Sequence, residues 1–163
     1  MRHLAVGLIT APLALALPGC LGGMPVPESG LNRQLEQAGN NRRPSLAGRW
    51  LALINAPPGD GRERVVLLDL ERRLPVPLPG LNRPDAQPLS VSVDVSGERL
   101  ALVRHLEGRT ELVLYRRSLQ SLQPIPIGPP GVPLAVQLRA DGRELAVQLS
   151  RNGLWQVDLI RIP

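Results

Sequence analysis

The residues that could do chemistry in this chain are few and scattered. The 163 residues include one Cys and two His, and all 19 cationic side chains are Arg. One Cys and two His supply too few ligands for a structural zinc site, so no metal is expected. His105 could act as a general base only beside a nucleophile and an orienting acid, and no Gly-x-Ser-x-Gly motif occurs in the sequence. We therefore expect no catalytic site, no cofactor and no enzymatic activity.

The other charged and aromatic residues suggest contacts with larger partners. Asp60, Asp85 and Asp141 lie beside Gly or Pro, where Asp favours the turn itself. Five arginines lie at or near the ends of expected strands and could form a basic rim that holds anionic headgroups: Arg72, Arg73, Arg116, Arg117 and Arg161. The alternative is that they are solvated strand-end residues. Trp50 and Trp155 are interpreted as packing residues, and either could line a partner groove.

Composition favours one folded domain with an aliphatic core. Apolar residues make up 43% of the chain and charged residues 20%, which excludes a disordered polymer. Aromatic residues make up only 2%, and Phe is absent. A chain so poor in aromatic rings has little with which to stack on bases, so no nucleic-acid partner is expected.

The first twenty residues predict an export signal. Arg2 and His3 precede an uncharged apolar stretch that runs to Leu17-Pro18-Gly19-Cys20. That ending resembles a bacterial lipobox, although Pro18 stands where a small residue such as Ala or Ser is usual. The resemblance implies a signal peptide over 1–19, a lipidated Cys20 and a short tether over 20–23. The alternative is an uncleaved membrane helix over 4–21, which Pro12 and Pro18 weaken.

The remainder of the chain, 24–163, repeats itself. Residues 89–117 align without a gap to 134–162, and both segments begin with apolar residues at alternate positions. This period of two predicts half-buried strands. The segment that begins at Gly48 matches the segment that begins at Gly97, which adds an earlier unit to the series. The units span about 45–88, 89–133 and 134–163, and each is expected to contribute up to four strands. Pro-rich stretches such as 75–78 predict edge strands, because Pro cannot pair on both sides.

A further match lies near the start of this region. Residues 24–33 align with 74–83, and most positions are identical, including Pro25 with Pro75 and Asn32 with Asn82. We therefore expect 24–33 to supply a spare fourth strand that completes the last unit.

The turn Ala140-Asp141-Gly142-Arg143-Glu144-Leu145-Ala146 resembles the blade repeat of TolB-type β-propellers. The resemblance implies an all-β fold of three propeller-type units. Since propellers have 4–8 blades, three units predict an open fan, half of a six-bladed ring made by a homodimer, or a small sandwich.

The two resemblances together imply a lipid-anchored, non-enzymatic envelope protein on the periplasmic side that presents a β surface to another envelope protein. Leu21 stands where the familiar inner-membrane retention signal has Asp, which favours the outer membrane. The alternative function is an envelope protein that binds a sugar or peptidoglycan fragment in a pocket containing Trp50, Trp155 and several Arg.

Overall fold

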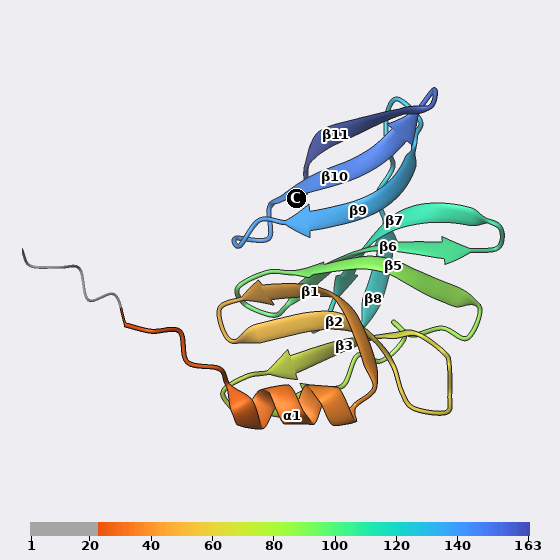
Figure 1. Ribbon diagram of the computed structural model, residues 1–163. Coiled ribbons are helices and arrows are strands. Elements are labelled where there is room, and N and C mark those ends of the chain that lie inside the picture. Colours follow the sequence, from red (N-terminus) through yellow and green to blue (C-terminus); the bar gives the residue numbers. More distant parts are fainter. Residues whose placement is uncertain (1–22) are drawn as a thin grey trace, which may run out of the picture.

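The computed structural model describes residues 23–163, which form one helix and three antiparallel sheets (Figure 1). The first sheet has the order β1 (Asn40–Ala47), β2 (Trp50–Ala56), β3 (Arg64–Asp69) and β4 (Leu74–Val76). The second has β5 (Ala86–Val93), β6 (Arg99–Leu106), β7 (Arg109–Arg116) and β8 (Ser121–Pro124). The third has β9 (Val132–Leu138), β10 (Glu144–Arg151) and β11 (Leu154–Arg161). The predicted all-β architecture of repeated units is confirmed.

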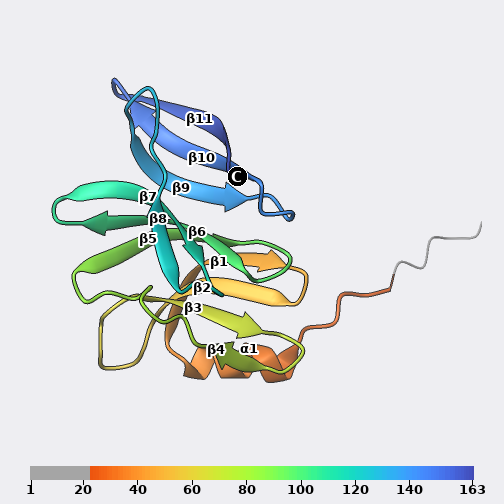
Figure 2. The same ribbon diagram turned by 180° about the vertical axis from the view of Figure 1, so that it is seen from behind.

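The second sheet lies between the other two, so both of its faces are buried (Figures 1 and 2). Along β6, Leu100 and Leu102 point towards the first sheet, while Ala101 and Val103 point towards the third. Each pair joins a separate aliphatic layer. The core of the molecule is therefore two layers of side chains, one on each side of the middle sheet.

The polar positions of β5 are more buried than its alternating pattern predicts. Ser90 and Ser92 were expected on a solvent face, yet they are only 5% and 3% exposed. Their hydroxyls accept hydrogen bonds from the backbone N–H groups of Val136 (3.1 Å) and Leu138 (2.8 Å). Serine is small enough to fit between two sheets, and its hydroxyl ties β5 to β9.

The prediction of a strand over 24–33 is wrong. Residues 23–28 have no regular structure, and α1 spans Ser29–Gln37. The matching segment 74–83 forms β4 and a turn, and Pro84 follows it, which would break a helix at that point. The segment 24–33 is followed by Gln34 instead of Pro84. After Gln34 come Leu, Glu, Gln and Ala, all good helix formers. Within residues 23–163, no fourth strand therefore pairs with β11.

The Pro-rich segments are edge strands, as predicted. β4 contains Pro75 and β8 ends at Pro124, and each is the last strand of its sheet. A proline there removes a donor only on the unpaired side.

Helix α1 covers the face of the first sheet that points away from the second sheet (Figure 1). The side-chain amide of Asn41 donates to the Leu35 carbonyl (2.6 Å), and that of Asn55 donates to the Ala38 carbonyl (3.0 Å). At the other edge of this sheet, the Gln34 amide donates to the Arg73 carbonyl (3.2 Å). The helix is thus fixed across the sheet from β1 to the turn after β3.

Candidate functional site: the uncovered face of the third sheet

The third sheet buries one face and leaves the other open. Leu145, Val147 and Leu149 of β10 point towards the second sheet, so the alternate residues of β10 point away from it. The strand register places residues of β9 and β11 on the same side. We call this surface the third-sheet face, and its members are Ala135, Gln137, Ala146, Gln148, Ser150, Trp155, Val157 and Leu159.

Large apolar side chains dominate the β11 part of this face. Trp155 is 64% exposed, Val157 67% and Leu159 71%. On the first sheet, Leu53 and Leu68 also point away from the middle sheet, yet they are 3% and 6% exposed. Helix α1 lies on this side of the first sheet (Figure 1). The two ends of the stack therefore differ: one has a helical cap, and the other presents apolar side chains to water.

A groove of about 900 Å³ runs beside this face, along the first strands of the three sheets. Ser45, Ser90 and Ser92 are its hydroxyl-bearing residues, and their oxygen atoms already accept backbone N–H groups of neighbouring strands. Arg43, Gln137, Arg139 and Glu144 also line the groove, so it combines apolar surface with several charged and polar side chains.

The charged end of the third sheet carries three arginines, Arg139, Arg143 and Arg161, and two acids, Asp141 and Glu144. The Arg139 guanidinium donates to the carboxylates of Asp141 and Glu144, and Arg161 lies opposite Glu144 in the strand register. The hydrogen bond from Arg139, helped by the backbone N–H of Arg143, lowers the pKa of the Asp141 carboxyl to about 2. Asp141 is therefore ionised across the physiological pH range.

The five arginines of the predicted basic rim lie at one end of the sheets. Arg72 and Arg73 are in the turn between β3 and β4, Arg116 and Arg117 are at the end of β7, and Arg161 ends β11. Acidic residues of the same turns are mixed with them, namely Asp69, Glu71, Glu98, Asp141 and Glu144. Four more arginines lie in or beside the turns at this end, Arg49, Arg99, Arg139 and Arg143, so the end has mixed charges with a net excess of arginine.

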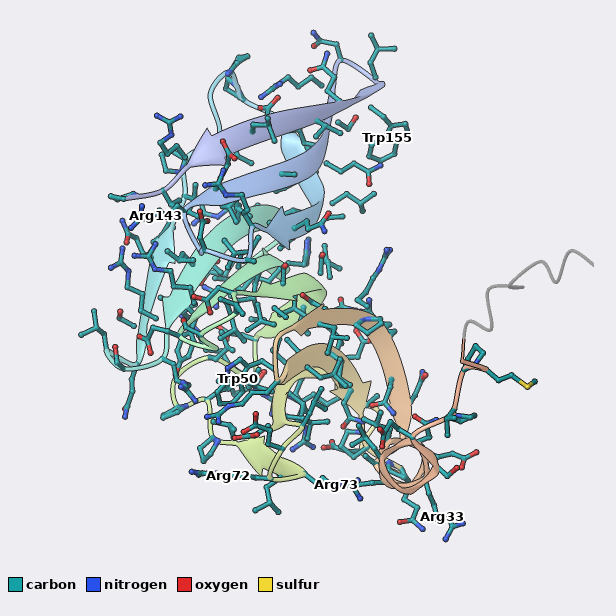
Figure 3. All side chains as sticks on the ribbon, turned by 90° about the vertical axis from the view of Figure 1, so that its left-hand side faces the viewer. Arg33, Trp50, Arg72, Arg73, Arg143 and Trp155 are labelled. Atoms are coloured by element: carbon teal, nitrogen blue, oxygen red, sulfur yellow. The ribbon has the colours of Figure 1, made fainter. Side chains whose placement is uncertain are left out.

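The two tryptophans are in different environments (Figure 3). Trp50 is 5% exposed, and the guanidinium groups of Arg49 and Arg117 lie 4.7 and 4.9 Å from its ring centroid. Trp155 lies on the third-sheet face at the opposite end of the molecule. The structure does not bring them together, so they do not form the pocket that the ligand-binding alternative requires. Arg49 was missed in the sequence, although its position next to Trp50 was a usable signal.

The structure describes no other reactive cluster. His105 lies in β6, exposed, opposite Gln87 and Thr110. Among residues 23–163, no three His, Cys, Asp or Glu side chains gather as metal ligands, and α1 is too short and polar to cross a membrane. The predicted signal peptide and Cys20 lie outside the described residues.

Solved structures of β-propeller proteins are similar to this fold. TolB from Acinetobacter baumannii aligns with a TM-score of 0.58 and 16% identity over 77% of this chain and 30% of that chain. The β-propeller domain of the Trilobed protease from Pyrococcus furiosus aligns with a TM-score of 0.49 and 13% identity over 76% of this chain and 42% of that chain. No family model and no curated protein matches the sequence. The predicted TolB-like β-propeller fold is thus confirmed, and the three sheets of residues 23–163 do not close into a ring by themselves.

Proposed function

We propose that this chain is a membrane-anchored envelope lipoprotein whose propeller-type sheets serve as a protein-interaction module. The observation that carries the proposal is the third-sheet face, an exposed apolar β surface that no helix covers, whereas α1 covers much of the corresponding face of the first sheet. Protein interfaces are centred on such side chains, and Trp contributes more than most when a partner covers it. The docking surface is therefore assigned to Trp155, Val157 and Leu159.

The anchor in this proposal is a diacylglyceryl group on Cys20. A lipid chain holds a protein to a membrane without spanning it, and a second attachment strengthens the hold. The five rim arginines, Arg72, Arg73, Arg116, Arg117 and Arg161, would supply that second attachment at about 1 kcal/mol per Arg near an anionic surface. The protein would then sit on the periplasmic side of the envelope, held by the tether 20–23.

A charge placed on the docking surface tests the interaction. We expect Leu159→Glu to reduce the amount of partner recovered after crosslinking in intact cells about tenfold, because a carboxylate would have to be desolvated in the interface. Leu159 is 71% exposed, so the fold itself should be unaffected. Gln156→Glu is the matched control, since it adds the same charge to the opposite side of β11. Equal recovery with both variants would remove the third-sheet face as the docking surface.

Replacement of Cys20 tests the anchor. Once its signal peptide has been cleaved, the Cys20→Ser chain should move from the membrane to the soluble fraction after cell lysis, because the remaining electrostatic attachment is weak and screened by salt. Membrane fractionation at physiological and high salt, followed by blotting, measures this. A Cys20→Ser chain that has lost its signal peptide, as its size on the blot shows, and still stays in the membrane fraction at high salt would contradict lipid anchoring.

A further inference from the structure

We propose that the third-sheet face docks the same face of a second copy of this chain. This inference rests on the proposed function, because it names the partner of the surface assigned there. The two faces would lie about 10 Å apart, with Val157 and Leu159 of each copy between them, as in other packed pairs of sheets. The contact is isologous, so each copy contributes the same residues.

The charge distribution favours a second copy as the occupant. The whole chain carries a formal net charge of +5, so two copies repel each other over most of their surfaces. The third-sheet face itself consists of Ala, Gln, Ser, Val, Leu and Trp, none of them charged. The residues at its charged end are Arg139, Arg143 and Arg161 with Asp141 and Glu144, a net charge of +1. Two copies can meet through the uncharged face itself without like-charge repulsion, and that face offers an anionic ligand or membrane no cationic side chain.

The other end of the molecule cannot provide the matching surface. Helix α1 covers the first sheet, and it turns Asn32, Arg33 and Glu36 to the solvent (Figure 3). A polar helix surface would leave the apolar side chains of the third sheet poorly matched. Pairing through identical third-sheet faces also ends after two copies, because α1 caps both outer ends of the resulting stack. A closed dimer follows, not an extending filament.

The chain already contains the kind of contact that this dimer requires. The middle sheet packs through its two faces against the first and third sheets, which are repeats of the same pattern. In the dimer, the third sheet of the second copy would cover the third-sheet face in the same way. Three strands of about eight residues give a face of roughly 25 by 15 Å, which is small for a stable dimer. We therefore expect association in the micromolar range, strengthened when two anchored copies share one membrane.

Sedimentation of the purified full chain in detergent tests the pairing. Over about 10–100 µM the wild type should be mostly dimeric, since a micromolar dimer is populated there. Leu159→Glu and, separately, Val157→Asp should each raise the dissociation constant at least about 100-fold and give monomers. Gln156→Glu should stay dimeric. Circular dichroism checks that each variant keeps its sheets.

The outcomes separate this inference from the proposed function. A monomeric wild type across the range, or a dimer that survives both variants, would overturn docking of a second copy through this face. The purified sample contains no other protein, so a monomer leaves open that a different protein binds the face in cells. In that case Leu159→Glu would still reduce recovery of that protein in cells. If the purified chain is monomeric and Leu159→Glu also leaves recovery in cells unchanged, the proposed function is removed as well.

Discussion

Replacing Gly97 by Ala is expected to lower the free energy of unfolding by roughly 3 kcal/mol, a large part of the 5–15 kcal/mol typical of a domain. Gly97 lies in the β5–β6 turn with φ of 68°, where an L side chain is strained by about 1 kcal/mol. A Cβ there would overlap the indole ring of Trp50. The ring has little room to move, because Arg49 and Arg117 lie against it. Overpacking at such a site costs a further 1–3 kcal/mol or so.

Gly153→Ala is the matched control for this prediction. Gly153 has a similar φ of 77°, in the β10–β11 turn, but a Cβ there meets nothing within 4 Å. Its replacement should cost only the backbone strain, about 1 kcal/mol. Equilibrium urea unfolding followed by circular dichroism compares the two. Equal losses would show that the indole ring of Trp50 does not crowd a side chain at position 97.

Removing the carboxylate of Asp94 is expected to lower the free energy of unfolding by about as much as Gly97→Ala does. Asp94 is 4% exposed, and its carboxylate accepts hydrogen bonds from the backbone N–H groups of Glu98 (3.0 Å) and Arg99 (3.1 Å) and from the Ser96 hydroxyl (2.6 Å). Asp94→Ala leaves the Arg99 N–H without an acceptor, whereas the Glu98 N–H keeps the Ser96 hydroxyl (3.3 Å) and the exposed Ser96 hydroxyl can donate to water. An unsatisfied donor costs about 1–3 kcal/mol and each lost hydrogen bond about 1 kcal/mol, so we expect a total near 3 kcal/mol.

Asp141→Ala provides the comparison, because this Asp also lies in a hairpin turn but its side chain is 43% exposed. Water replaces the lost carboxylate there, and the cost should stay below about 1 kcal/mol. Urea unfolding of the two variants measures the difference. An Asp141→Ala loss as large as that of Asp94→Ala would mean that burial of the turn is not what makes Asp94 important.

The sheets were predictable because repetition and alternation are both properties of the chain itself. The gapless match between 89–117 and 134–162 corresponds to the second and third sheets, whose hairpins turn at Gly97 and Gly142. The segment 24–33 was not predictable from the match alone. The deciding difference is the next residue, Gln34 in one copy and Pro84 in the other, which permits a helix in the first and prevents it in the second.

The docking surface could be predicted only in part. Trp50 and Trp155 were both interpreted as packing residues that could line a partner groove. The membership of Trp155 in a larger apolar face with Val157 and Leu159 depends on which sheet faces are covered. Alternation places these three on one side of β11 and does not say which side meets a neighbour. Similarly, nothing local in the sequence shows that Ser90 and Ser92 lie between two sheets. Such facts come from the stacking order of the sheets, which is a long-range property of the fold.

The most direct test of the account asks whether the third-sheet face is covered in cells. A photoreactive amino acid placed at Val157 should form a crosslinked adduct in intact cells on irradiation, because that side chain lies in the proposed interface. The same amino acid at Asn32, on the solvent side of α1, should give no specific adduct. Adducts at Val157 alone would support docking through this face. No adduct at Val157, or equal labelling at both positions, would contradict it.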